Sequence, residues 1–224
     1  MAEDHFIELR DVTKIYHQGE NPVIALDHVH LSLPKGGFIA ITGKSGCGKS
    51  TLINILGGLD SPDQGSVMIQ GEDISRMDDR RLTLFRRDRV GIIFQFFNLL
   101  PILNHEENIA LPYLLREGSK PPPAKMERLL EETGLSDRRH HRPHELSGGE
   151  MQRVAIGRAL INDPEIILAD EPTGNLDSAS GKQVLGILAR LRDERGKTIV
   201  LVTHSQEGAS AADRVIQMRD GKLL

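Results

Sequence analysis

Residues 43–51 read Gly43-Lys44-Ser45-Gly46-Cys47-Gly48-Lys49-Ser50-Thr51. The apolar run Phe38–Thr42 before them is typical of a buried strand, and Leu52–Leu56 after them is typical of a helix. Because the three glycines of the stretch allow steep backbone turns, successive N–H groups can converge on phosphate oxygens at the start of that helix. In such a loop Lys49 reaches the β- and γ-phosphates, and the Ser50 hydroxyl holds Mg²⁺. The stretch therefore predicts a nucleotide-binding loop, and an ordinary glycine-rich turn is the less favoured alternative.

Length and composition describe an ordinary globular chain. Its 224 residues are enough for one sizeable core with a satellite subdomain. The net charge is -4, and without a basic excess we expect no nucleic-acid partner. The polar, acidic start Met1–His5 lacks the pattern of a secretory signal. No apolar run reaches the roughly 20 residues that cross a bilayer, so we expect any membrane role to come through a partner.

Cys47 is the only cysteine of the chain. It excludes an internal disulfide and fits a reducing cytoplasm. Its place at the start of a helix allows a reactive, oxidisable thiol. A small spacer residue is the favoured alternative, because reactivity also requires an exposed thiol.

The first third of the chain predicts antiparallel strands around a parallel core. Phe6–Tyr16 is predicted to be an edge strand. Val29, Leu31 and Leu33 alternate with polar residues, as in a sheet with one wet face. The other predicted elements of the α/β core are a strand at Gly65–Gly71, a helix at Asp78–Arg89, a strand at Gly91–Phe94, a helix that ends at Gly196, a strand at Thr198–Thr203 and a hairpin around Asp220-Gly221.

The middle of the chain carries helical signals. Glu106–Arg116 and Met126–Thr133 predict helices. The apolar stretch Phe96–Leu103 before them is interrupted by proline and has two interpretations: a buried core loop, or an apolar docking surface for a partner. Within a single domain, we expect residues of about 97–160 to form a helical subdomain. It is inserted into a core made of about 1–96 and 161–224.

Three histidines in the middle segment, His140, His141 and His144, raise the hypothesis of a metal site. Arginines lie between and beside them in residues 138–142, and their charges would repel a divalent ion. A solvated basic loop is therefore the favoured interpretation.

The segment Leu146–Glu150 opens a predicted helix that runs to about Ile161. Ser147 and Glu150 have the spacing of a capping box, so Ser147 is the predicted N-cap. Gly148 and Gly149 then leave the amides of the first turn unshielded. The pattern predicts a second anion-binding helix terminus, without a lysine or a metal ligand of its own. A plain capped helix is the alternative.

Two predicted strands end in side chains suited to phosphoryl transfer. Glu165–Glu171 is a buried strand that delivers two carboxylates at its C-terminal end, where open α/β sheets bind ligands. Asp170 suits a metal ion and Glu171 suits a base that orients the attacking water. His204 follows the strand Thr198–Thr203 and is aimed at the same crevice.

As a set, these motifs resemble the ATPase subunit of ABC transporters over nearly the whole chain. The matching positions are Tyr16 as the aromatic that stacks on adenine, residues 43–51 as the Walker A loop, Gln95 as the Q-loop glutamine, Leu146–Glu150 as the signature, Ile166–Glu171 as Walker B, Asn175–Asp177 as the D-loop and His204 as the switch histidine. The resemblance implies the ABC ATPase fold with a P-loop NTPase core, and ATP and Mg²⁺ as cofactors. It implies catalytic roles for Glu171, His204 and Gln95, metal contacts from Ser50, Gln95 and Asp170, and a nucleotide contact from Asp177.

In this family two subunits pair head to tail. The resemblance therefore implies a homodimer in which Ser147, Gly148 and Gly149 touch the γ-phosphate held by Lys49 of the second copy. The segment Phe94–Pro101 looks like the branch that serves lipoprotein release, macrolide export, peptide-antibiotic resistance and cell division. That branch implies an integral membrane permease, a periplasmic partner reached through the permease, and a place on the cytoplasmic, inner face of the cell membrane.

Two departures from the family pattern leave the catalytic motifs intact but leave the partner's identity open. Cys47 stands where serine is usual, and Asn104-His105 replaces the common Thr-Val.

Other classes of protein share part of this pattern. A soluble P-loop kinase, GTPase or DNA-repair ATPase is disfavoured, because the chain lacks an Asn-Lys-x-Asp guanine-reading motif and a basic face. A cell-division or antibiotic-sensing ATPase that transports nothing would carry the same machinery. The transported substrate and the direction of transport are not encoded in these motifs.

Overall fold

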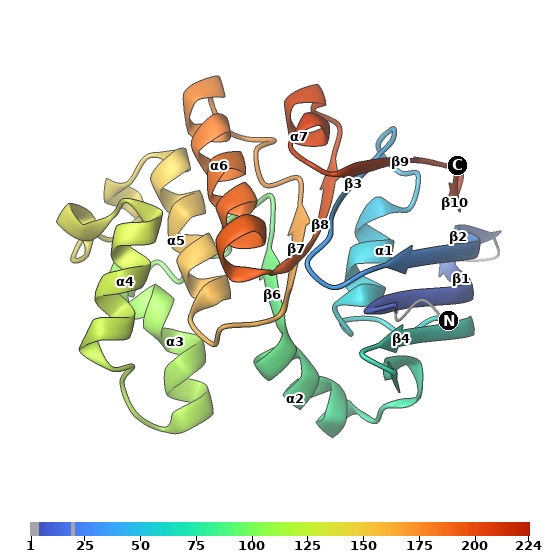
Figure 1. Cartoon of the computed structure of the whole chain (residues 1–224), viewed down its shortest axis with the longest axis horizontal. Helices are drawn as coiled ribbons and strands as arrows, with labels where there is room; N and C mark the ends of the chain where they lie inside the picture. Colours follow the sequence, from blue (N-terminus) through green and yellow to red (C-terminus); the bar gives the residue numbers. More distant parts are fainter. Residues whose placement is uncertain (1–4, 19–20) are drawn as a thin grey trace.

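Two sheets organise the computed structural model, which describes residues 5–18 and 21–224 (Figure 1). The first sheet is antiparallel, with four strands in the order β2-β1-β4-β5. Its strands are β1 (Ile7–Gln18), β2 (Asn21–Leu33), β4 (Gln64–Ile69) and β5 (Glu72–Asp73). The second sheet has six strands in the order β10-β9-β3-β8-β7-β6 and is parallel except for β10. Its strands are β3 (Phe38–Thr42), β6 (Val90–Ile93), β7 (Ile166–Asp170), β8 (Thr198–Thr203), β9 (Arg214–Arg219) and β10 (Lys222–Leu223). This arrangement confirms the predicted α/β class with a mixed sheet.

Helices lie on both sides of the parallel sheet (Figure 1). They are α1 (Lys49–Leu56), α2 (Asp79–Arg89), α3 (His105–Glu117), α4 (Pro123–Thr133), α5 (Gly148–Leu160), α6 (Ser178–Arg195) and α7 (Gln206–Ser210), with short 3₁₀ turns at Ile74–Arg76, Ser136–Arg138 and Pro143–Glu145. No helix in the described part of the chain is long and apolar enough to cross a membrane.

Both faces of the parallel sheet are buried, which explains the uninterrupted apolar runs of its strands. Along β8, Val200 and Val202 belong to a core shared with α1 and the antiparallel sheet. Ile199 and Leu201 point to the opposite face and join a second core with α5 and α6. The central strands are thus fixed from two sides, and their C-terminal ends form a rigid support for a site.

The position of β1 corrects one prediction. The segment predicted to be an edge strand lies inside the antiparallel sheet, where β1 pairs with β2 on one side and with β4 on the other. Alternation of apolar and polar residues reports which face of a strand is wet, but it does not report the lateral neighbours of the strand. The predicted alternation is confirmed, since Val29, Leu31 and Leu33 of β2 are buried.

Helices α3 and α4 follow β6 in the sequence and pack at the end of the molecule that lies away from the antiparallel sheet (Figure 1). Asn104 and Glu107 form a capping box at the start of α3. Gly118 and Gly134 end the two helices in left-handed conformations, with φ of 68° and 64°. These local signals explain why both predicted helices are present. The division into subdomains at about residues 97 and 160 stays a prediction.

The apolar stretch between β6 and α3 is largely exposed. The side chains of Phe96 and Ile102 are 70% and 76% exposed, so the interpretation as a buried core loop is wrong. The buried Asn108 fixes the stretch: its side chain accepts a hydrogen bond from Leu100 N–H at 2.8 Å and donates to the carbonyl oxygens of Leu100 and Leu103, both at 3.1 Å. The stretch therefore presents apolar groups on an ordered backbone.

The C-terminal hairpin confirms its prediction and supports the phosphate loop. Asp220 and Gly221 join β9 to β10 with φ of 48° and 80°, as a two-residue hairpin turn requires. Gly221 N–H donates to the Cys47 carbonyl oxygen at 3.1 Å, and the Gly221 carbonyl oxygen accepts from Asp27 N–H at 2.9 Å. The turn therefore connects the phosphate loop to β2.

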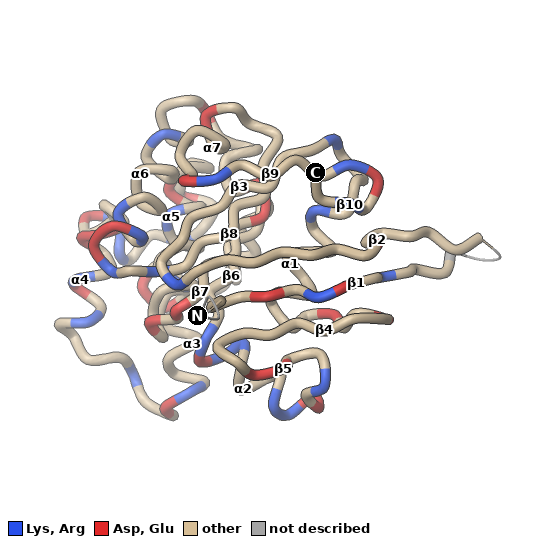
Figure 2. The backbone as a smooth tube through the Cα atoms, turned by 45° about the vertical axis from the view of Figure 1, so that its right-hand side comes forward, with Lys and Arg blue, Asp and Glu red and all other residues tan. Residues whose placement is uncertain are grey.

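Charged positions of both signs are spread over the helices and the antiparallel sheet (Figure 2).

Candidate active site

A cleft of about 630 Å³ lies where the C-terminal ends of the central strands meet the antiparallel sheet. Its volume falls in the range of roughly 300–1,000 Å³ that is usual for small-molecule sites. The predicted site residues that line it are Tyr16, residues 43–46 and 48–51, Gln95, Asp170, Glu171 and His204. Side chains from five separate parts of the chain are thus brought to one place.

The phosphate loop fits tightly against its surroundings. A Cβ atom on Gly43 would lie 2.3 Å from the Met218 carbonyl oxygen, and one on Gly48 would lie 2.2 Å from the Ala25 carbonyl oxygen. Gly48 also has a φ of 107°, which side-chain-bearing residues rarely adopt. Glycine at these two positions therefore sets the shape of the loop.

Lys49 lies across the loop. Its side chain is nearly buried, and Nζ donates to the carbonyl oxygens of Gly43 at 2.9 Å and Lys44 at 3.0 Å. These contacts place the ammonium group beside the backbone N–H groups at the start of α1, where no side chain caps the helix. Positive charge and free amides together favour an anion at this point.

Cys47 is buried and does not line the cleft. A Cβ atom on Gly43 would lie 2.8 Å from its Sγ, so the thiol fills space directly behind the loop. Because oxidisable thiols need access to solvent, this burial supports the spacer interpretation.

Asp170 and Ser50 form the part of the cleft that fits a hard cation. Asp170 Oδ1 is buried and has no hydrogen-bond partner among the described residues. Burial raises the pKa of Asp170 above its ordinary value, the charge of Glu171 raises it further, and a hydrogen bond from Ser50 and the charge of Lys49 oppose the shift. An unpaired carboxylate oxygen beside a hydroxyl is the donor set that Mg²⁺ prefers.

Glu171 and His204 contact each other at the cleft. His204 Nδ1 lies 2.8 Å from Glu171 Oε2, and His204 N–H donates to the same oxygen at 3.1 Å. Glu171 has a φ of 48°, an uncommon conformation for a residue with a side chain. Its N–H donates to the Val202 carbonyl oxygen at 2.9 Å. This left-handed turn directs the carboxylate into the cleft at the end of β7, where backbone strain often marks function.

Gln95 reaches the cleft from the end of β6. A Cβ atom on Gly174 would lie 3.0 Å from Gln95 Nε2, and Asn175 Nδ2 donates to the Gln95 carbonyl oxygen at 3.4 Å. The loop after Glu171 therefore packs directly on Gln95. A substitution in this loop would alter the position of Gln95, and a substitution of Gln95 would alter the loop.

Tyr16 lines the cleft with its ring held by its neighbours. Its hydroxyl donates to Asp60 Oδ2 at 2.7 Å, and Lys14 Nζ lies 5.3 Å from the ring centroid. The sequence reasoning missed Val23–Ala25 of β2, which line the same part of the cleft. Their only sequence signal is that Val23, Ile24 and Ala25 are consecutive apolar residues, without the alternation seen later in β2. In the structure Val23 and Ile24 are 46% and 54% exposed.

The predicted residues of the second anion site do not line this cleft. Ser147 caps α5 as predicted: its Oγ accepts from Glu150 N–H at 3.3 Å, and Glu150 Oε2 accepts from Ser147 N–H at 2.8 Å. Asp177 caps α6 by accepting from the N–H groups of Ala179 and Ser180, both at 3.0 Å. The lining of the cleft does not include these helix starts, namely Ser147, Gly148 and Gly149 at α5 and Asp177 at α6.

The histidine-rich loop shows no ligand arrangement for a metal. His140 and His144 are exposed. In residues 5–18 and 21–224, no group of three or more His, Cys, Asp or Glu side chains is placed to hold a metal ion. The solvated basic loop stays a prediction.

Comparison with known proteins defines the family. The family model for ABC transporters matches residues 26–174. The chain is 50% identical over 219 residues to an uncharacterized ABC transporter ATP-binding protein of Methanocaldococcus jannaschii, MJ1508. The alignment covers 97% of this chain and 97% of that protein. It is 48% identical over 223 residues to the macrolide export ATP-binding/permease protein MacB of Hyphomonas neptunium, of which it covers 34%. The chain therefore belongs to the ABC transporter family.

A solved structure specifies the subunit type. The dimeric, post-hydrolysis state of the ATP-binding cassette MJ0796 bound to ADP and Pi superimposes with a TM-score of 0.90, at 42% identity and with 97% of this chain and 96% of that chain covered. The chain is an ABC transporter ATP-binding subunit, and its enzymatic activity is ATP hydrolysis.

Proposed function

We propose that two copies of this chain pair head to tail, bind two Mg-ATP between them and couple hydrolysis to a membrane permease. One observation carries the proposal: the cleft holds the phosphate loop and the carboxylates, while the capped start of α5 with Ser147, Gly148 and Gly149 lies outside it. A second copy would supply that helix start to the γ-phosphate. The dimeric state of the MJ0796 cassette supports this pairing.

Within each cleft the residues have separate roles. Lys49 and the loop amides bind the β- and γ-phosphates, and the Tyr16 ring stacks on adenine. Ser50, Gln95 and Asp170 would hold Mg²⁺, which offsets phosphate charge when bound. Glu171 takes a proton from the attacking water. His204 lies 2.8 Å from the Glu171 carboxylate and positions that carboxylate.

The membrane partner is proposed to dock on the exposed segment Phe96–Pro101. Its apolar side chains stand on a backbone fixed by Asn108, which suits contact with an apolar helix of a permease. The MacB relative carries a permease in its name, which supports a partner of the lipoprotein-release or macrolide-export type. The chain would then sit on the cytoplasmic face of the cell membrane, and the permease would reach any periplasmic partner.

Glu171→Gln tests the catalytic assignment. We expect ATP turnover to fall by about 10²-fold or more, because the amide cannot accept a proton from water. Glu207→Gln, a change at an exposed glutamate outside the cleft, is the matched control and should keep wild-type turnover. Turnover of Glu171→Gln near the wild-type rate would remove Glu171 from the base role.

The same variant tests the dimer. With ATP and Mg²⁺, Glu171→Gln should double its molecular mass in light scattering, because trapped nucleotide holds two copies together. Adding Ser147→Arg should return the mass to that of one chain, whereas adding Ser119→Arg, at an exposed loop, should not. A mass that stays at one chain with ATP present would reject the head-to-tail pair.

Co-purification addresses the membrane partner. Extraction of membranes in mild detergent should yield this chain together with an integral membrane protein. Substitution of the exposed Phe96 and Leu100 by serine should release the chain from that protein while ATP binding is kept. A chain recovered only in the aqueous fraction would contradict the permease partner.

A further inference from the structure

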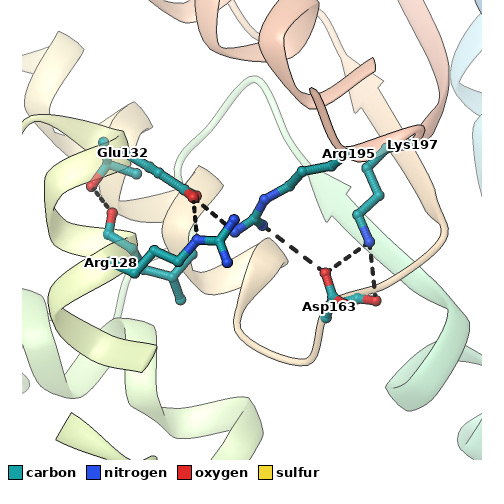
Figure 3. A network of polar contacts seen from close by, with 7 residues as sticks. Arg128, Glu132, Asp163, Arg195 and Lys197 are labelled. Atoms are coloured by element: carbon teal, nitrogen blue, oxygen red, sulfur yellow. Dashed lines mark hydrogen bonds and ion pairs between the residues drawn. The ribbon is translucent and has the colours of Figure 1, made fainter. Parts of the chain in front are cut away.

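A second cavity, of about 550 Å³, lies between α4 and the α6–β8 connection (Figure 3). Its walls come from α4, from the end of α5 and its following turn, and from the end of α6 with the adjoining Lys197. It shares no lining residue with the nucleotide cleft. Its volume is again that of a small-molecule site.

Basic side chains dominate the cavity. Lys125, Arg128, Arg195 and Lys197 line it. Two carboxylates, Asp163 in the wall and Glu132 beside it, form ion pairs with these groups. Four basic groups against two carboxylates leave an excess of two positive charges. The chain as a whole has the opposite sign, with a net charge of -4. A concave surface with an excess of one sign concentrates its field on an ion of the other sign.

The ion pairs orient the two arginines without engaging all their donors. Arg128 Nε and Arg195 Nη2 contact the same oxygen, Glu132 Oε1, at 2.9 and 2.8 Å. Because Arg128 uses Nε for this contact, its two terminal NH₂ groups take no part in it. Such a guanidinium edge binds phosphate or carboxylate oxygens through two parallel hydrogen bonds. In Figure 3 the arginines of α4 and α6 meet at Glu132, so one ligand could reach both.

Two lysines complete the cluster from opposite walls. Lys197 Nζ donates to Asp163 Oδ1 at 2.8 Å, and its side chain is 9% exposed. Lys125 Nζ lies 5.0 Å from the ring centroid of Tyr113. Burial lowers the pKa of Lys125 from its ordinary value; the charges of Asp163 and Glu117 oppose this shift, and those of Arg116 and Arg195 add to it.

We propose that the cavity binds a small molecule carrying two or three clustered negative charges, as phosphate or carboxylate groups. Four basic side chains bind this molecule: Lys125 and Arg128 from α4, and Arg195 and Lys197 from the core. The bound anion ties the helical segment to the end of α6, at a distance from ATP. The apolar side chains of Leu129 and Leu160 in the wall accommodate the carbon part of such a ligand.

The chain offers an internal reporter for this site. It has two tyrosines and no tryptophan, so Tyr16→Phe leaves Tyr113, beside Lys125, as the source of tyrosine emission. The Tyr16→Phe protein is saturated with Mg-ADP to occupy the nucleotide cleft, and citrate or inorganic phosphate is added at constant ionic strength. We expect a saturable change in emission with either anion, and no saturable change with acetate.

A charge-matched pair of variants locates the binding. Lys125→Gln/Arg128→Gln should weaken citrate binding at least tenfold, whereas Arg80→Gln/Lys182→Gln, which removes the same charge at exposed positions, should not. The thermal midpoint gives a second readout that does not depend on Tyr113, because a ligand of the folded state raises it. No saturable change with citrate or phosphate, or equal weakening in both pairs, would overturn the proposal. Binding of a polyglutamate peptide without binding of either small anion would overturn it as well.

Discussion

The buried His105 makes stability depend on pH in a way that one substitution can remove. It is the first residue of α3, its side chain is 1% exposed, and Nδ1 lies 3.2 Å from the Arg138 carbonyl oxygen. Its Nε2 is buried without a hydrogen-bond partner among the described residues. Burial lowers the pKa of His105 from 6.5 to about 4, although the charges of Glu106 and Glu150 act in the opposite direction.

The sign and size of the effect follow from proton linkage. Because the pKa of His105 is lower in the folded chain, the unfolded chain takes up the proton first as pH falls. Stability is therefore complete above pH 6.5 and declines as pH falls from 6.5 toward about 4. Over the whole window the loss is roughly 3 kcal/mol, of which about 2 kcal/mol is lost by pH 5.

The variant His105→Val removes the titrating group and the unpaired Nε2. We expect its free energy of unfolding at pH 7.5 to stay within about 1 kcal/mol of wild type, because a buried unpaired nitrogen is replaced by an apolar group of smaller volume. Between pH 7.5 and pH 5, the variant should lose about 2 kcal/mol less than wild type.

Urea unfolding followed by circular dichroism at both pH values measures this difference. His140→Val removes an exposed histidine near the same turn and serves as the control, which should lose as much stability as wild type. If His105→Val and wild type lose the same free energy between the two pH values, His105 is not buried in the neutral form and the reasoning is refuted.

Further changes test the loop, the apolar stretch and the metal site. Gly48→Ala should abolish ATP binding in a filter assay, since its Cβ atom would lie 2.2 Å from the Ala25 carbonyl oxygen; wild-type affinity would contradict the close fit. Asn108→Ala should cost about 2–4 kcal/mol in urea unfolding, because it removes three hydrogen bonds between the buried Asn108 side chain and the stretch; a change below 1 kcal/mol would show that the stretch orders itself. Asp170→Asn should raise the thermal midpoint, because burial disfavours the Asp170 carboxylate and its Oδ1 has no hydrogen-bond partner among the described residues, yet abolish Mg²⁺-dependent ATPase activity. A lower midpoint would mean that the Ser50 hydrogen bond and the charge of Lys49 outweigh the cost of burial.

Much of the site could be predicted from local sequence because its signals are local. Glycines between an apolar strand and a helix identify the phosphate loop, and Ser147 with Glu150 three residues later identifies the start of α5. The left-handed glycines that end α3 and α4 are likewise encoded in single residues. Carboxylates and a histidine directly after apolar strands predict a common edge, since parallel strands end on the same side.

The sequence by itself thus determined most of the helices and strands, though not β5 or α7, together with the phosphate loop and the chemistry available at the strand ends. Only the tertiary structure decided which residues meet. It placed β1 between two strands and brought Val23–Ala25 of β2 to the cleft. It also kept Ser147 away from that cleft and joined α4 to α6 around a basic cavity. The physical reason is that hydrophobic periodicity and helix caps act over a few residues. Lateral strand order and side-chain proximity, by contrast, are set by pairing and packing between segments far apart in the chain, such as β3 with β8.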